Sequence, residues 1–178
     1  MRIVSAIQLA DHTTFYWCMK RKHQRGLTRI SRAISSTADG HLYVAFALAL
    51  WIKQNPESSS LLEVLLVSIL IERLLYFVLK NTCKRNRPPA ALPGFKAFIV
   101  PADQFSFPSG HTSAAFLFAT LLALAFPELT ILAFAWSSLV ACSRVLLGVH
   151  FPSDTLVGAS MGVFTALMVA SQLNFSGV

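Results

Sequence analysis

The fold is decided by residues 129–173, which read LTILAFAWSSLVACSRVLLGVHFPSDTLVGASMGVFTALMVASQL. Two apolar blocks within this stretch, 129–147 and 155–173, have about the 20 residues that a helix needs to cross the hydrocarbon core of a bilayer. The turn between them holds His150, and Pro152 is suited to open the second helix. The stretch therefore predicts a helical hairpin in a membrane.

The rest of the chain also indicates a polytopic membrane protein. Of its 178 residues, 54% are hydrophobic and only 13% are charged, which is too apolar for a typical soluble domain. A block at 61–79 is long enough to span, whereas 112–126 and 41–53 are shorter and need tilt or flanking residues to complete a crossing. We expect an all-α membrane bundle of about five transmembrane helices.

The N-terminal segment differs from this transmembrane core. We expect a single domain over residues 1–178, in which 41–178 form the core. Residues 1–40 carry Asp11 inside their only early apolar stretch, which disfavours both a span and a signal peptide. We interpret this segment as an interfacial helix, and the basic run at 20–32 as a contact with anionic lipid headgroups rather than with nucleic acid.

Three short motifs bring polar side chains into this apolar chain. They are Lys80 with Arg87-Pro88, then Pro108-Ser109-Gly110-His111, then Ser143-Arg144 followed by His150 and Asp154. With five spans, simple alternation places all three motifs at one membrane face. Together they supply three cations, two imidazoles and one carboxylate, a combination suited to handling a phosphate ester.

Each motif also has a purely structural interpretation. Lys80 could extend to the lipid headgroups at the end of a span. Ser109 could cap the helix that follows it. Asp154, in the first turn of the last helix, could stabilise the helix dipole.

Other features of the motifs favour chemistry. A helix start that offers free N–H groups, Ser109 and Gly110 is also an anion site. His111 is an ionisable residue at the entrance of a span, where burial without a role is costly. His150 and Asp154 are four residues apart, so the carboxylate could bond one ring nitrogen and leave the other facing a substrate.

The three motifs resemble the type 2 phosphatidic acid phosphatase (PAP2) superfamily, membrane lipid phosphatases related in their site to vanadium haloperoxidases and bacterial class A acid phosphatases. The family pattern is Lys, six residues, Arg-Pro; then Pro-Ser-Gly-His; then Ser-Arg, five residues, His, three residues, Asp. Residues 80–154 match it without a departure, whereas the first 40 residues carry little of the resemblance.

The resemblance implies a mechanism. His150 is expected to be the nucleophile that takes the phosphoryl group, oriented by Asp154, while His111 acts as the acid. The expected phosphate-binding residues are Lys80, Arg87, Ser109, Gly110 and Arg144. Because the motifs lack the grouped carboxylates that magnesium demands, we expect neither a metal nor another cofactor.

The expected function is that of an integral membrane lipid phosphatase. Undecaprenyl diphosphate, phosphatidylglycerophosphate and phosphatidic acid are the substrates that the resemblance implies, and the sequence does not separate them. One alternative is a non-catalytic membrane protein that binds or transports a lipid phosphate, and another is a haloperoxidase or acid phosphatase with the same site. The resemblance implies a bacterial inner membrane, while the membrane face of the site and the oligomeric state stay open.

Four residues outside the motifs need an interpretation. Glu72 and Arg73 lie deep in the 61–79 block. Being adjacent, they are expected to point in different directions, with an ion pair to another helix favoured over an extension of the basic pocket. Tyr43 and Tyr76 are interpreted as interfacial or packing aromatics.

Overall fold

The computed structural model describes residues 2–20, 24–101 and 103–175, and over these residues the chain is helical and contains no strand. The elements are α1 (Arg2–Met19), α2 (Gln24–Ser36), α3 (His41–Lys53), α4 (Pro56–Cys83), α5 (Pro88–Ala91), α6 (Gly110–Ala125), a 3-10 turn η1 (Pro127–Leu129), α7 (Thr130–Leu146) and α8 (Pro152–Gln172). The all-α fold class is therefore confirmed.

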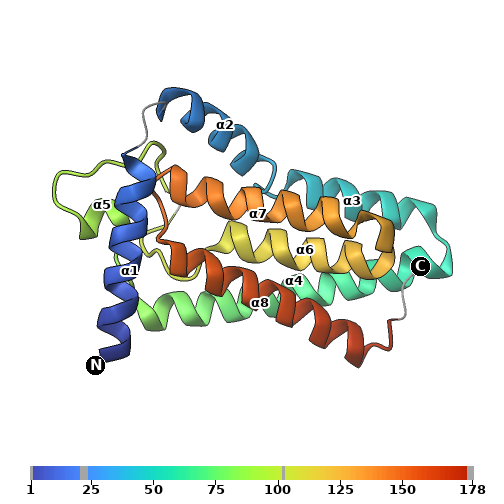
Figure 1. Cartoon of the computed structure of the whole chain (residues 1–178). Helices are drawn as coiled ribbons and strands as arrows, with labels where there is room; N and C mark the ends of the chain where they lie inside the picture. Colours follow the sequence, from blue (N-terminus) through green and yellow to red (C-terminus); the bar gives the residue numbers. More distant parts are fainter. Residues whose placement is uncertain (1, 21–23, 102, 176–178) are drawn as a thin grey trace.

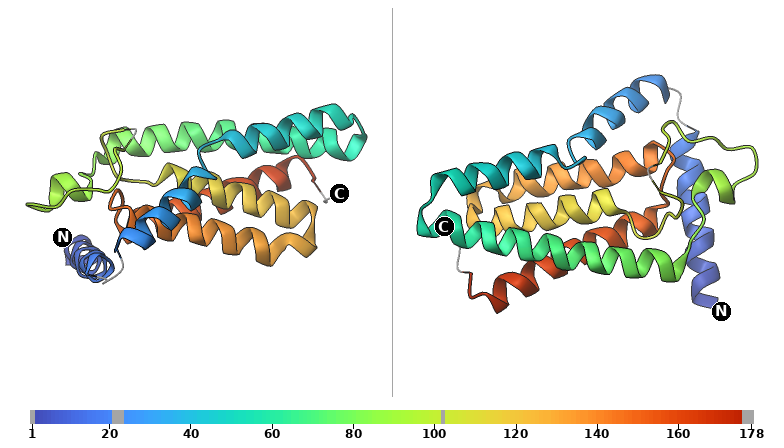
Figure 2. Two further views of the ribbon diagram at one scale, coloured as in Figure 1. Left: turned by 90° about the horizontal axis from the view of Figure 1, so that it is seen from above. Right: turned by 180° about the vertical axis from the view of Figure 1, so that it is seen from behind.

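Helices α3, α4, α6, α7 and α8 run along one axis as a bundle (Figure 1). Within it, α6 lies between α7 and α8 and also contacts α4. Helix α1 lies across one end of this bundle, and α2 runs obliquely from that end toward α3 (Figure 2). The same end holds α5 and the loop that leads to α6. Here α4 and α7 end while α6 and α8 begin, so the chain directions bring the three motifs together.

The centre of the bundle is packed closely. Leu117 and Leu121 of α6 form a buried cluster with residues of α4 and α8, among them Leu65 and Ala166. A Cβ placed on Gly162 of α8 would lie 2.2 Å from the carbonyl oxygen of Ser113. Helices α6 and α8 therefore approach backbone to backbone, as small residues permit between membrane helices.

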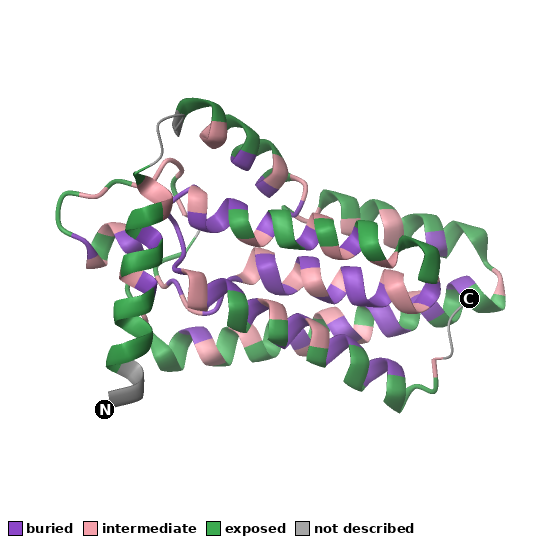
Figure 3. Ribbon diagram, in the orientation of Figure 1, coloured by how far each residue is buried: buried purple, intermediate pink, exposed green. Residues whose placement is uncertain are grey.

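Exposed residues lie along the outer faces of the helices (Figure 3), and many of them are large and apolar. Large exposed side chains include Trp51, Leu70, Phe77, Ile131, Leu156 and Phe164, whereas Ser68, Thr120, Ser137 and Thr165 are buried. This distribution suits a lipid environment. Within the described residues, Pro127–Leu146 and Pro152–Gln172 have the length and hydropathy of membrane spans. The expected count of five spans stays a prediction.

The boundaries of the predicted segments can be compared with the helices. Helix α3 coincides with the predicted block 41–53, and α4 extends beyond 61–79 at both ends. The N-terminal segment forms two helices rather than a single interfacial one. Residues 21–23 of the basic run lie outside the described residues. Arg32 of α2 donates a hydrogen bond to the carbonyl oxygen of Phe98, at 2.9 Å, which ties α2 to the loop between α5 and α6.

Candidate active site

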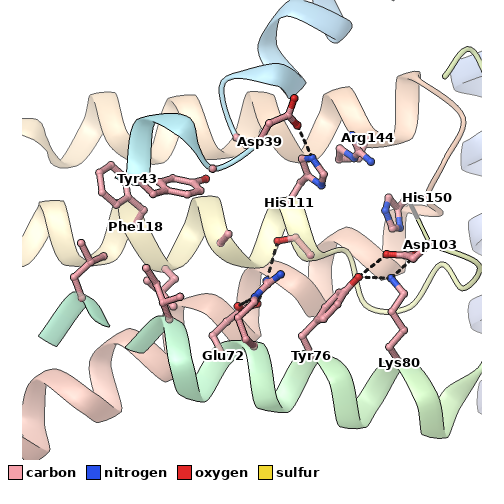
Figure 4. Close-up of a pocket in the computed structure, with 18 of the residues that line it drawn as sticks. Asp39, Tyr43, Glu72, Tyr76, Lys80, Asp103, His111, Phe118, Arg144 and His150 are labelled. Carbon is pink, nitrogen blue, oxygen red and sulfur yellow. Dashed lines mark hydrogen bonds and ion pairs between the residues drawn. The ribbon is translucent and has the colours of Figure 1, made fainter. Parts of the chain in front are cut away.

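All eight predicted site residues lie at the end of the bundle that α1 crosses. Lys80 is in the last turns of α4, Arg87 immediately precedes α5, Ser109, Gly110 and His111 open α6, Arg144 is in the last turn of α7, and His150 and Asp154 flank the start of α8. Six of them line one cavity of about 510 Å³ (Figure 4). Ser109 and Asp154 are fully buried.

Two cations of the first motif converge on a carboxylate that sequence analysis missed. Lys80 Nζ lies 2.9 Å from Asp103 Oδ1, and the guanidinium of Arg87 pairs with the same carboxylate. Tyr76 donates its hydroxyl proton to Asp103 at 2.7 Å and accepts from Lys80 at 2.6 Å. Although burial opposes it, this set of hydrogen bonds lowers the pKa of Asp103 to about 2. The cations are thus arranged to bind an anion.

The reactive nitrogen of His150 faces this cation cluster. Arg87 Nη1 lies 3.3 Å from His150 Nε2 and donates to the carbonyl oxygen of Val149 at 2.7 Å. Because a guanidinium can only donate hydrogen bonds, Nε2 must be the acceptor, which puts the ring proton on Nδ1. The lone pair of Nε2 is therefore directed toward the place where an anion would bind.

Both carboxylate oxygens of Asp154 accept hydrogen bonds from donors other than His150. Oδ2 accepts from the backbone N–H of Phe151 at 2.8 Å, and Oδ1 accepts from Arg85 Nη1 at 2.7 Å. His150 Nδ1 is 3.7 Å from Asp154 Oδ2, so the direct hydrogen bond expected from the sequence is not formed. Two competing donors occupy the carboxylate, which acts on the imidazole by charge at this distance.

His150 lies in the turn between α7 and α8 and is almost completely buried. Burial, together with the nearby charges of Arg87 and Arg144, lowers its pKa to about 4, and Asp154 only partly opposes this. At neutral pH the imidazole is therefore uncharged, which is the form that can act as a nucleophile.

Arg85 and Asp11 extend the support of Asp154 to α1. Arg85 Nη2 donates to Asp11 Oδ2 at 2.6 Å, and the buried Asp11 also accepts from the backbone N–H of Ser153 at 2.9 Å. Sequence analysis did not assign either residue to the site. The available signal was a carboxylate within the apolar stretch of α1, where burial requires a partner.

The start of α6 joins the second motif to the third. Ser109 occupies the N-cap position, but its Oγ lies 3.0 Å from the hydroxyl of Thr112 rather than capping the backbone. The backbone N–H of Ser109 donates to the carbonyl oxygen of Asp154 at 3.0 Å. A Cβ on Gly110 would lie 2.8 Å from the ring of Tyr76, so this position favours glycine.

His111 and Arg144 have partners in the N-terminal segment. His111 Nε2 lies 2.8 Å from Asp39 Oδ1, and Arg144 Nη1 donates to Ser35 Oγ at 2.6 Å. Arg144 Nε is buried and has no hydrogen-bond partner among the described residues, so it retains a donor for a ligand. Neither Asp39 nor Ser35 lies near a motif in the sequence.

The structure corrects the expectations for Glu72, Arg73 and Tyr76, which lie outside the motifs. Arg73 pairs with its neighbour Glu72, at 2.6 Å between Nη2 and Oε1, because its long side chain folds back across the helix surface. Ser113 of α6 also bonds Glu72. Tyr76 is a polar member of the site rather than a packing aromatic. Tyr43 packs against Phe118 and Trp136, as expected, and also lines the cavity.

The chain is similar to several known proteins. The family model described as the PAP2 superfamily matches residues 61–177. The lipid A 1-phosphatase of Rhizobium etli is 31% identical over 110 residues, which cover 60% of this chain and 47% of that protein. The chain thus spans about half the length of this relative. Bacitracin transport permease protein BcrC of Bacillus licheniformis is 30% identical over 146 residues, covering 75% of this chain and 70% of BcrC.

Two solved structures have the same architecture. LpxE of Aquifex aeolicus superposes with a TM-score of 0.76 at 25% identity, covering 89% of this chain and 93% of LpxE. A transmembrane PAP2 type phosphatidylglycerolphosphate phosphatase from Bacillus subtilis superposes with a TM-score of 0.73 at 29% identity, covering 94% of this chain and 86% of that protein. With the extent of the family match and the agreement in fold, the chain belongs to the PAP2 superfamily.

Proposed function

We propose that this protein is an integral membrane phosphatase that hydrolyses a lipid phosphate or diphosphate. The observation that carries the proposal is the lining of the cavity. Lys80, Arg87 and Arg144 line one part of it, and Leu65, Ile69, Leu117 and Phe118 line another. A substrate with an anionic head and a hydrocarbon tail matches both parts.

In the first step, His150 Nε2 attacks phosphorus and the bond from phosphorus to the lipid-side oxygen breaks. His111 gives a proton to the departing oxygen, so the lipid leaves as a neutral alcohol or as a protonated lipid phosphate. The cations hold the non-bridging oxygens, over which negative charge is spread in the transition state. Asp154 balances the positive charge that His150 gains.

In the second step, His111 takes a proton from a water molecule that attacks the phosphohistidine. The bond between phosphorus and Nε2 breaks, inorganic phosphate forms, and His150 returns to its neutral state. Both steps use the same cation cradle, which in this proposal replaces a divalent metal. Full activity in a strong chelator is the expected result, and strict dependence on added magnesium would count against the mechanism.

The names of the relatives supply candidate substrates. We include lipid A 1-phosphate and phosphatidylglycerophosphate, from the names of two compared proteins, together with undecaprenyl diphosphate and phosphatidic acid. The test measures phosphate release from each lipid by purified protein in detergent with chelator. Release by the parent and its loss in His150→Ala are expected, and the ranking of rates identifies the substrate class.

A matched histidine variant controls for damage to the fold. His41→Ala changes an exposed residue at the start of α3 and is expected to keep the parent's activity. If the parent and His150→Ala release phosphate equally, the catalytic proposal fails. Tight lipid phosphate binding without release would favour the binding or transport protein instead.

We also propose a bacterial inner membrane as the location. The exposed Cys83, at the end of α4 beside the site, can report which face carries the site. Intact cells are treated with a membrane-impermeant maleimide, and labelling of the parent protein is compared with labelling of Cys83→Ser. We expect labelling of Cys83 only if the face that carries the site is on the outside of the membrane.

A further inference from the structure

Asp39 contacts His111, the proton donor in the first step of the proposed reaction. Its Oδ1 lies 2.8 Å from His111 Nε2, across 72 positions of sequence (Figure 4). The segment that carries Asp39 joins α2 to α3 and contains none of the three motifs. The contact therefore brings a residue from outside the motifs into the site.

The segment around Asp39 is anchored on both sides of the site. Trp136 Nε1 of α7 donates to Thr37 Oγ1 at 2.9 Å, and Ala38 is buried in a cluster with Ala115 of α6 and Val140 of α7. Gly40 follows with a φ of 108°, a left-handed conformation that turns the chain into α3 and suits glycine. These contacts hold the Asp39 backbone over the start of α6.

The charges around His111 come from three elements. Burial most of all, and then the cations Arg144 of α7 and Arg73 of α4, disfavour a protonated imidazole, whereas Asp39 opposes them through its hydrogen bond and its charge. An acid must carry a proton before it can donate one. Among the described residues, Asp39 is the carboxylate that contacts His111 directly and partly offsets the effects of burial and of the two cations.

We propose that Asp39 is a positioning residue that orients His111 and assists its proton donation to the leaving oxygen. The inference rests on the proposed phosphatase function. A carboxylate that holds one ring nitrogen presents the other to the substrate. With Nε2 held by Asp39, the proton passes from Nδ1 to the lipid-side oxygen as the bond from phosphorus to that oxygen breaks and the bond to His150 forms.

The test uses two substrates that differ in their need for an acid. Phosphatidic acid loses an alkoxide, which requires protonation, whereas p-nitrophenyl phosphate loses a stable phenolate that requires little. For Asp39→Asn we expect kcat/KM to fall by about tenfold or more with phosphatidic acid and by less than about threefold with p-nitrophenyl phosphate. Because kcat/KM reports steps up to the first irreversible one, it isolates this transfer from the later hydrolysis.

Two further readouts separate positioning from a structural role. In Asp39→Asn the alkaline limb of the kcat/KM profile for phosphatidic acid is expected to move to lower pH, because the negative charge that favours the imidazolium is lost while Arg144 and Arg73 remain. Asp39→Glu keeps the charge and is expected to recover most of the activity. The matched control, Glu128→Gln, removes an exposed carboxylate from η1 at the far end of the bundle.

Each outcome has a definite meaning. An equal loss with both substrates and an unmoved pH profile would overturn the role of Asp39 while leaving the phosphatase intact. Unchanged activity in Asp39→Asn would overturn it too. A parent that releases no phosphate from either substrate would instead remove the proposed function, and this inference with it.

Discussion

Replacing Asp103 with asparagine is expected to tighten the binding of inorganic phosphate and orthovanadate. The Asp103 carboxylate pairs with Lys80 and Arg87, the same cations that would grip a substrate phosphate. A bound phosphate must therefore displace it. Asparagine has the same size and keeps an oxygen, but it removes the competing charge.

The size of the effect follows from the exposure of the carboxylate. The Asp103 side chain is 39% exposed while those of Lys80 and Arg87 are nearly buried, so each ion pair is screened by solvent. Two partly exposed pairs at about 0.5–1 kcal/mol each amount to about 1–2 kcal/mol. The inhibition constants of phosphate and vanadate are then expected to fall by about 5- to 30-fold.

The pH dependence gives a second check. Hydrogen bonds from Tyr76, Lys80 and Arg87 hold the pKa of Asp103 at about 2, against the effect of burial. A lowered carboxyl pKa means that the competing charge is present above that value and is lost only as pH falls through it. The ratio of parent to variant inhibition constants should therefore stay constant from about pH 5 to about pH 8.

The assay measures inhibition of p-nitrophenyl phosphate hydrolysis at fixed ionic strength. Glu128→Gln makes the same charge change far from the site and is expected to leave the inhibition constants unchanged. An inhibition constant that is the same or higher in Asp103→Asn would refute the reasoning, because it would mean that the carboxylate supports the cations instead of competing for them.

Three further predictions concern the nucleophile and the packing. Because the pKa of His150 is lowered to about 4, kcat/KM should stay level as pH falls to about that value and then decline as the imidazole gains a proton; an acid limb near pH 6.5 would contradict the described environment. Labelled phosphate substrate, quenched in alkali, should leave a base-stable and acid-labile label on the parent but none on His150→Ala. Gly162→Ala forces a Cβ against the Ser113 carbonyl and should cost about 1–3 kcal/mol of stability. Its thermal midpoint in detergent is compared with Gly26→Ala, which meets no atom within 4 Å and should not be destabilised; equal midpoints would show that α6 and α8 can separate without cost.

The family and the helical fold class could be predicted from the sequence, because both depend on short-range patterns. The spacing of His150 and Asp154 places both at the start of α8, and the apolar blocks coincide well with α3, α7 and α8. The role of Tyr76 was also within reach of sequence reasoning, since it lies one helical turn before Lys80 and the two side chains contact each other. Hydropathy instead directed its interpretation toward packing.

The sequence by itself determined which residues make up the predicted phosphate site, because their spacing and their positions at helix ends are local properties. Only the tertiary structure decided what surrounds them. Asp39 reaches His111 from the α2–α3 turn, Asp103 reaches Lys80 from a loop, and Asp11 reaches Arg85 from α1. No local periodicity encodes such contacts. They form because burial of a charge at the crowded end of a bundle is costly until an opposite charge, brought there by the packing of distant helices, offsets it.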